Sequence, residues 1–408
     1  MTTNRTNPDL KYWIWLSRAL RPGRRIEPVL AHFPGGPEEL FRGTEIVLRT
    51  SGVFRETELS RLVTKDLTET DRILADCAAG DLDVLTPDDR DYPPYLRPLP
   101  DRPLVLYAKG DVSLLRGSRT PFAMVGTRRA EDRTLCAAAA LSGTLTKCGF
   151  LIVSGGALGV DTAAHLGALH ADGPTVAVLG AGIGARYLAC NEPLREAIGR
   201  QGVLLTEHPP GEEPTRYSFP VRNRIIAGMT AGTLACEATV KSGTLLTTKS
   251  AIEQGRDVFV LHPSRETAAF QGIRELIRDG ATEVRCAADV LAPYRDGTSY
   301  LEPFYRQALH PDTVPETELY REVLQDGNAA FSLTLPASLQ RPRTKRPIGD
   351  PLSGSARAVY DCLDGTPLSL FQLREKTGLA ENALLGAVTE LEVYHYIADC
   401  DGVRYTYT

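Results

Sequence analysis

Six short apolar runs between residues 120 and 290 constrain the fold more than any other feature of this sequence. Stretches with helical spacing separate them, and the runs lack the polar alternation of a strand with one face in water. Strands that are apolar on both faces and alternate with helices form a parallel sheet covered on both sides. The pattern therefore predicts a doubly wound, Rossmann-like α/β core. The six expected strands are 122–125, 150–153, 176–179, 203–205, 233–236 and 258–261.

The composition changes along the 408 residues and indicates four parts. The first is mainly helical, and a Pro-rich stretch with a short strand at 104–107 connects it to the core. The third is Pro-rich and irregular, with one expected helix at 316–325. We expect an N-terminal helical domain, the Rossmann-like domain, a linker region and a small C-terminal domain, at 1–95, 96–291, 292–353 and 354–408.

The C-terminal part carries three helical patterns and then a hairpin signal, which together predict a winged helix. The helices are expected at 356–363, 369–377 and 381–397. The hairpin turn is expected at Asp401-Gly402. The third helix contains Glu381, Glu390 and Glu392 and neither Lys nor Arg, which disfavours insertion into the major groove of DNA. We expect this domain to contact another protein.

Charge and cysteine usage exclude several classes of protein. The net charge of −5 means that any site for a polyanion is a local patch. No pair of the eight cysteines has C-x-x-C spacing, which argues against a zinc site, and scattered thiols are typical of a reducing compartment. No apolar run approaches the ~20 residues of a membrane helix, and the N-terminus lacks the core of a signal peptide. We expect a cytoplasmic protein with no membrane segment, metal or other cofactor.

Two glycine-containing turns follow expected strands at the edge where open parallel sheets bind ligands. In V-G-T-R (125–128), Gly126 permits a tight turn, and Thr127 and Arg128 are expected at the start of the next helix. The turn S-G-G-A-L-G-V-D (154–161) leads into another helix, whose N–H groups and dipole favour an anion. Tight packing of strand against helix explains either turn equally well. The first turn has only one glycine and the glycine-rich turn follows the second strand, so the G-x-G-x-x-G fingerprint of dinucleotide-binding enzymes is misplaced. The sequence also lacks the G-x-x-x-x-G-K-[ST] phosphate loop.

The stretch S-F-P-V-R-N-R-I-I-A-G-M (218–229) joins a buried helix pattern to groups that bind anions. A helix that begins near Pro220 places Arg222 on the apolar face, at the end of the sheet, and places Arg224 on the opposite, surface side.

Phe219 and Asn223 flank this arginine, so the segment offers a ring, a guanidinium and an amide. Arginine contacts phosphate bidentately, and an aromatic ring stacks on a base. In the alternative, Arg222 pairs within the protein with Glu207 or Glu237.

A further turn, K-S-G-T (241–244), lies where the next strand gives way to a helix. It is a typical anion-binding turn, with a lysine at its mouth. The alternative is an exposed lysine before an ordinary helix cap.

In combination, these motifs resemble the DNA-processing protein A (DprA, or Smf) family. The matching segments are G-T-R (126–128), S-G-G-A-L-G-V-D (154–161), E-H-P-P-G (207–211), F-P-V-R-N-R-I-I-A-G (219–228) and K-S-G-T-L (241–245). The resemblance extends loosely to both ends, where that family has a SAM-like domain and a winged helix. The chain departs from the family pattern at Leu188, at His262-Pro263 and at Arg274.

The resemblance implies a non-catalytic protein that binds and protects single-stranded DNA and loads a RecA-type recombinase during natural transformation. It also implies homodimerisation through the Rossmann-like domain, with single-strand-binding protein as a further candidate partner. Carried over residue by residue, it assigns DNA contact to Thr127, Arg128, Ser154, Gly155, Gly156, Phe219, Arg222, Asn223, Arg224, Lys241, Ser242, Gly243 and Thr244.

Two classes of enzyme are alternatives to a DNA-binding protein. A nucleotide hydrolase of the phosphoribohydrolase type would need a carboxylate in the crevice, for which Glu207 and Glu237 are candidates, but its P-G-G-x-G-T signature is absent. An NAD-linked oxidoreductase is disfavoured by the misplaced glycines and by the position of His165 and His170 on a helix.

Overall fold

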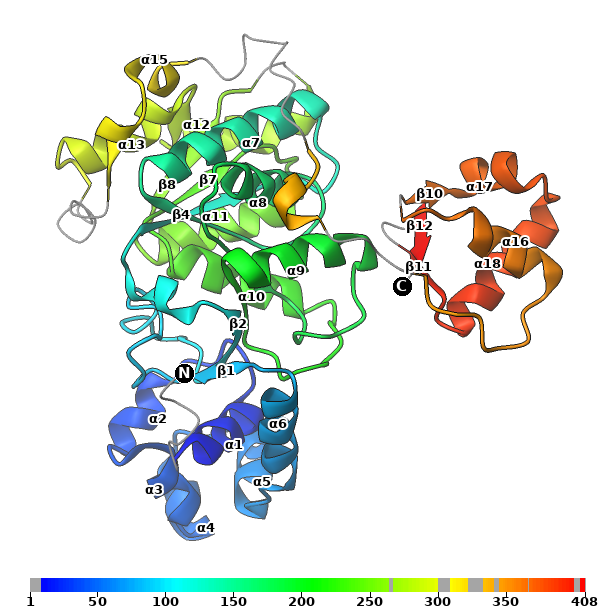
Figure 1. Cartoon of the computed structure of the whole chain (residues 1–408). Helices are drawn as coiled ribbons and strands as arrows, with labels where there is room; N and C mark the ends of the chain where they lie inside the picture. The colour runs from blue at the N-terminus through cyan, green and yellow to red at the C-terminus, as the bar shows by residue number, and fades with distance from the viewer. Residues whose placement is uncertain are drawn as a thin grey trace. The chain divides into compact units, whose positions relative to one another are not determined.

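The structure is a computed structural model of the whole chain (Figure 1). It describes residues 9–263, 267–299, 309–321, 333–340, 345–365, 367–399 and 404–407. The chain divides into two compact units. The first contains 1–185 and 197–336, and the second contains 186–196 and 337–408.

Six short helices open the first unit and share one apolar core. They are α1 (Leu10–Leu20), α2 (Glu27–His32), α3 (Gly36–Arg42), α4 (Glu45–Thr50), α5 (Glu56–Thr64) and α6 (Thr68–Ala79). The first helix is apolar on most of its surface and contacts α3, α5 and α6, which explains why both tryptophans, Trp13 and Trp15, are buried. The prediction that the N-terminal part is mainly helical is therefore confirmed.

A nine-stranded sheet forms the centre of this unit, in the order β1-β2-β6-β5-β4-β3-β7-β8-β9. The strands are β1 (Asp83–Leu85), β2 (Leu106–Gly110), β3 (Thr120–Val125), β4 (Phe150–Ser154), β5 (Thr175–Leu179), β6 (Val203–Thr206), β7 (Gly232–Ala235), β8 (Asp257–Leu261) and β9 (Thr282–Val284). Strands β3 to β9 pair in parallel, whereas β1 and β2 are antiparallel additions at one edge. All six expected core strands are present, and the α/β class with a mostly parallel sheet is confirmed.

The strand order reverses between β3 and β7. Ala123 of β3 lies opposite Val153 of β4 on one side and Thr233 of β7 on the other. The chain therefore winds outward from β3 in both directions, and the loops that leave the carboxyl ends of β3 and β7 diverge. Ligands of open α/β sheets bind at such a point.

Alternate residues of β3 are buried on opposite faces of the sheet. Phe122 and Met124 belong to the core beneath α7, α8 and α13, whereas Ala123 and Val125 belong to the core that includes α10. This two-sided burial explains why the strands read as continuous apolar runs. The helices are α7 (Asp132–Lys147), α8 (Val160–His170), α9 (Glu192–Gln201), α10 (Ser218–Gly228), α11 (Gly243–Glu253), α12 (Gln271–Arg278), α13 (Ala287–Arg295) and α15 (Glu316–Leu319). No helix in the described part of the chain is long and apolar enough to cross a bilayer.

In its described residues, the 337–408 part of the second unit contains three α-helices and a small antiparallel sheet in the order β10-β12-β11. These elements are α16 (Gly354–Cys362), β10 (Leu368–Ser369), α17 (Leu370–Thr377), α18 (Glu381–Val393), β11 (Ile397–Asp399) and β12 (Arg404–Tyr407). Helix α18 ends earlier than expected because the next turn places His395 at a φ of 57°. The predicted turn Asp401-Gly402 lies outside the described residues. The helix predicted at 316–325 ends already at Leu319, so the expectation is wrong at residues 320 and 321, and residues 322–325 lie outside the described part.

Candidate functional site

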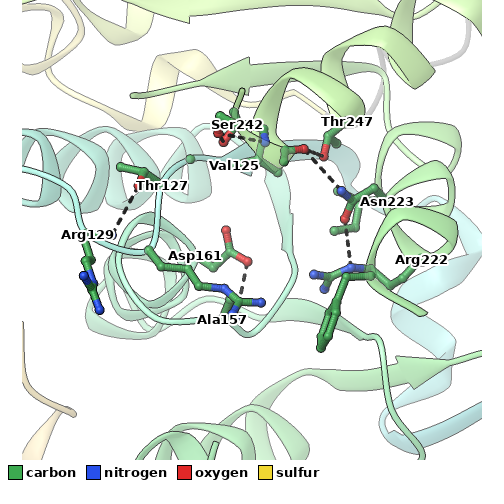
Figure 2. A pocket seen from close by; sticks show the side chains of 15 residues that line it. Val125, Thr127, Arg129, Ala157, Asp161, Arg222, Asn223, Ser242 and Thr247 are labelled. Carbon is green, nitrogen blue, oxygen red and sulfur yellow. Dashed lines mark hydrogen bonds between the residues drawn. The ribbon is translucent and has the colours of Figure 1, made fainter. Parts of the chain in front are cut away.

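A cavity of about 430 Å³ lies where the strand order reverses, at the carboxyl ends of β3 and β7 (Figure 2). We call it the crevice. Four chain segments line it: 125–129 after β3, Ala157 and Asp161 after β4, part of α10, and the start of α11. The sequence separates these segments, and the parallel sheet brings them together.

The loop after β3 presents two arginines to the crevice. Gly126 is required there because a Cβ atom would lie 2.4 Å from Cγ2 of Val160. The segment that follows β7 holds this loop, since Thr127 N donates to the carbonyl of Glu237 (3.0 Å) and Glu131 N donates to its carboxylate (3.1 Å). Helix α7 begins only at Asp132, so Arg128 and Arg129 lie in the loop and are exposed. The expectation that Arg128 starts a helix is wrong.

Arg222 extends from α10 beneath the crevice and is 7% exposed. Its Nη1 donates to the carbonyl of Gly155 (2.7 Å) and to that of Val178, and its Nε donates to Oδ1 of Asn223 (3.1 Å). These bonds tie α10 to the carboxyl ends of β4 and β5. The cation is therefore fixed in place before any ligand binds.

The glycine-rich turn after β4 binds an anion from the protein itself. Oδ2 of Asp161 accepts hydrogen bonds from the N–H groups of Gly155 (3.1 Å) and Ala157 (3.3 Å). Burial raises the pKa of Asp161, and the charge of Arg222 opposes that shift. A Cβ atom on Gly155 would lie 2.2 Å from Nη1 of Arg222, so this turn serves close packing. The Ser154 hydroxyl donates to the carbonyl of Met124 (2.6 Å).

Phe219 forms one wall of the crevice and is half-buried. The guanidinium carbon of Arg128 lies 5.3 Å from the centre of its ring. Gly180 leaves room for the ring, because a Cβ atom there would approach Cδ1 of Phe219 to 2.8 Å. The wall thus pairs an apolar face with a cation.

The opposite wall is the N-terminus of α11. The Ser242 hydroxyl caps this helix by accepting a hydrogen bond from Thr244 N (3.1 Å). Asn223 of α10 donates to the carbonyl of Gly243 (3.4 Å), which joins the two helices across the crevice (Figure 2). A Cβ atom on Gly243 would meet no atom within 4 Å. The start of α11 is therefore open toward the crevice.

Arg224 has a different environment from the one expected. It is 8% exposed and its Nη2 donates to Oε2 of Glu207 at 2.5 Å, with Asp101 3.7 Å from its Nε. The expectation of a surface residue is wrong, because the loop that contains Gly23 covers this side of α10. Burial raises the pKa of Glu207, and Arg224 opposes that shift. Glu207 therefore pairs with Arg224, and Arg222 donates to the carbonyls of Gly155 and Val178 and to Asn223.

The structure separates the thirteen predicted residues into two groups. Eight line the crevice: Thr127, Arg128, Phe219, Arg222, Asn223, Ser242, Gly243 and Thr244. The other five are not among the lining residues: Ser154, Gly155, Gly156, Arg224 and Lys241. Arg129, Asp161 and Thr247 line it without having been assigned. Arg129 directly follows Arg128 in the T-R-R motif, and this adjacency could have identified it as a lining residue.

Comparisons with known proteins agree with this architecture. The family model for DNA recombination-mediator protein A matches residues 83–295. Protein Smf of Synechocystis sp. is 35% identical over 79% of each chain. DNA processing protein DprA of Streptococcus pneumoniae is 39% identical over 50% of this chain and 71% of its own.

A solved structure has a similar fold. The X-ray structure of DprA from Streptococcus pneumoniae superposes with a TM-score of 0.59 and 32% identity, covering 69% of this chain and 97% of that one. The chain therefore belongs to the DNA recombination-mediator protein A family, whose members are named DprA or Smf.

Proposed function

We propose that the crevice binds single-stranded DNA and that the protein performs no catalysis on it. The observation that carries this proposal is the pairing of Phe219 with Arg128 at the mouth of a cavity that also exposes Arg129. A ring and adjacent guanidinium groups match a nucleotide, whose base stacks and whose phosphate is anionic. Affinity should come mainly from phosphate contacts and fall with salt, with weak sequence preference.

The positions of the carboxylates disfavour the hydrolase alternative. Neither Glu207 nor Glu237 is among the lining residues of the crevice, and each accepts hydrogen bonds from the protein. Asp161 lines the crevice, but its Oδ2 is held by two main-chain N–H groups. A hydrolase of this type would release free base from a nucleoside monophosphate, and we expect no release.

Fluorescence anisotropy with a labelled single-stranded oligonucleotide tests the proposal. We expect salt-sensitive binding that duplex DNA and mononucleotides fail to compete. The double variant Arg128→Ala, Arg129→Ala should reduce the magnitude of the slope of log K against log salt by about 1.4, since each phosphate contact contributes about 0.7. The matched control Arg90→Ala, Arg278→Ala removes two exposed arginines outside the crevice and should bind like the unmodified protein. Full affinity in the double variant would overturn the site assignment.

We propose further that the protein is a homodimer and that it passes the bound strand to a RecA-type recombinase. It would do so also when single-strand-binding protein already covers the DNA. The family's description as a recombination mediator supports this role. Recombinase ATPase activity on covered single strands should rise when the protein is added, and Arg128→Ala, Arg129→Ala should abolish the rise. Sedimentation at micromolar concentration should give twice the 44.4 kDa chain mass. An unchanged ATPase rate would contradict the mediator role.

We also propose that the N-terminal helices are SAM-like and that the second unit is a winged helix for protein contact. Three helices and a three-stranded antiparallel sheet support the second assignment. Phe371 and Val393 are 69% and 67% exposed, which favours an apolar partner over duplex DNA. Duplex affinity should therefore be equally weak with and without residues 354–408. Tight duplex binding that depends on these residues would contradict this role.

A further inference from the structure

A second cavity, of about 450 Å³, lies among the N-terminal helices and is lined mainly by arginines. The loop between α1 and α2 and the start of α5 form its walls. The arginines are Arg21, Arg24, Arg25, Arg55 and Arg61, which we call the arginine patch. One carboxylate, Glu58, is present among the lining residues.

Glu58 is already neutralised within the protein. Its Oε1 accepts a hydrogen bond from Nε of Arg24 (2.9 Å), and its Oε2 accepts one from the main-chain N–H of Arg55 (2.9 Å). Arg24 also donates to the carbonyl of Val53 (2.8 Å), so it is a structural residue of this loop. Arg61 is likewise tied to the carbonyl of Ala19 (3.2 Å). The patch therefore keeps a strong net positive charge.

Arg21, Arg25 and Arg55 carry the accessible part of this charge. All three are exposed, and in the described part of the chain no carboxylate lies within 4.0 Å of their guanidinium groups. The loop that bears the first two is fixed, because Gly23 takes a φ of 80° and Ile26 N donates to the carbonyl of Pro100 (2.8 Å). Three like charges held close together repel one another, and a polyanion relieves that repulsion.

Helix α10 connects the arginine patch to the crevice. A Cβ atom on Gly23 would lie 3.5 Å from Val221 and 3.6 Å from Nε of Arg224, so the loop packs against one side of α10. Phe219 and Asn223 on the same helix line the crevice. The crevice and the loop of the arginine patch therefore lie on different sides of one helix, whose diameter with side chains is about 10–12 Å.

We propose that the arginine patch binds the phosphates of the same single strand that occupies the crevice, a few nucleotides further along. This inference rests on the proposed function of the crevice. No aromatic residue lines the patch cavity, so the patch contacts the phosphodiester backbone and leaves the bases unread. Charge is the recognised feature, and the chemical class of ligand is an extended polyphosphodiester. Short strands fill the crevice alone, and long strands reach both sites.

The test compares two lengths of oligothymidine, about 5 and about 25 nucleotides, because one single-strand site spans roughly 4 to 16 nucleotides. Anisotropy is measured over a salt series with the full-length protein and with Arg21→Gln, Arg25→Gln, Arg55→Gln. Glutamine keeps the side-chain stem, and Arg24 and Arg61 are left in place to protect the fold. The control Arg42→Gln, Arg90→Gln, Arg278→Gln changes the charge equally at exposed positions outside both cavities.

We expect the triple variant to bind the short strand like the unmodified protein and the long strand more weakly. Its salt slope for the long strand should fall in magnitude by about 2, from the loss of three phosphate contacts at about 0.7 each. Unchanged affinity for the long strand would overturn the proposal, as would an equal loss at both lengths. If the unmodified protein bound neither strand, the proposed function of the crevice would itself be wrong.

Discussion

The guanidinium group of Arg128 lies over the ring of Phe219, with 5.3 Å between the guanidinium carbon and the ring centre. The two residues belong to the same wall of the crevice but come from different segments, one from the loop after β3 and the other from α10. A ligand that contacted this ring would therefore lie next to a cation. The contact couples the apolar and the electrostatic parts of the site.

Replacing Phe219 should weaken single-strand binding while leaving its salt dependence intact. Stacking contributes about 1–3 kcal/mol per base, so we expect Phe219→Ala to bind roughly 5- to 150-fold more weakly, and Phe219→Trp to retain affinity. Anisotropy over a salt series measures both quantities. Tyr217→Ala is the matched control, because Tyr217 is 64% exposed and does not line the crevice. Equal losses in the two alanine variants would show that the ring has no special role.

Gly155→Ala should damage both stability and binding. Its Cβ atom would lie 2.2 Å from Nη1 of Arg222 and 2.5 Å from Oδ2 of Asp161. Overpacking of this kind lowers the free energy of unfolding by about 1–3 kcal/mol. Displacement of Arg222 would in addition disturb the crevice. Gly243→Ala is the contrasting variant, because its Cβ meets nothing within 4 Å. Its free energy of unfolding should rise by about 0.4–1 kcal/mol. Urea unfolding measures both changes, and equal stabilities would contradict the packing argument.

Arg224→Met should destabilise the protein although it lies outside the crevice. The change leaves Glu207 buried without its partner, which should lower the free energy of unfolding by about 3–5 kcal/mol. The double variant Arg224→Met, Glu207→Leu should recover most of that loss. Urea unfolding followed by tryptophan fluorescence reports the change through Trp13 and Trp15, which are both buried among the N-terminal helices. As a comparison, a variant that breaks the exposed Arg42–Glu38 pair should lose less than about 1 kcal/mol of unfolding free energy. A double variant no more stable than Arg224→Met would argue against a buried-charge effect.

Sequence patterns located most of the sheet because its strands are buried on both faces. They missed β1 and β9, each of three residues, because so short a segment carries no periodicity. They missed the role of Asp161 for a different reason. A glycine-rich turn before a helix reads as an anion site, and the sequence cannot tell whether the anion is a ligand or a carboxylate of the same chain.

The misplacement of Arg224 has a physical cause as well. A helical wheel assumes that one side of α10 packs and the other faces water. Here the sheet packs on one side and the N-terminal loop at Gly23 on another, so both Arg222 and Arg224 are buried. Only the tertiary contact between segments about 200 residues apart could reveal this.

Glu237→Gln should change stability in a pH-dependent way. Burial raises the pKa of Glu237, so the native state holds its proton more tightly than the unfolded chain does. The stability from this group is fully present below its unfolded pKa of 4.5 and is lost as the pH rises through the folded pKa. Glutamine keeps an acceptor for Glu131 N without the charge. The stability of Glu237→Gln relative to the unmodified protein should therefore increase between about pH 4 and pH 8. A difference that does not change with pH would contradict this shift.

The crevice draws its walls from segments that span residues 125 to 247, and β3 contributes the first of them. During synthesis, the loop after β3 emerges long before the helix that must face it. A growing chain that has released β3 to β6 already exposes Arg128 and Arg129 but has no α11, so it has cations without a cavity. The crevice is therefore complete only after α11 has left the ribosome and docked.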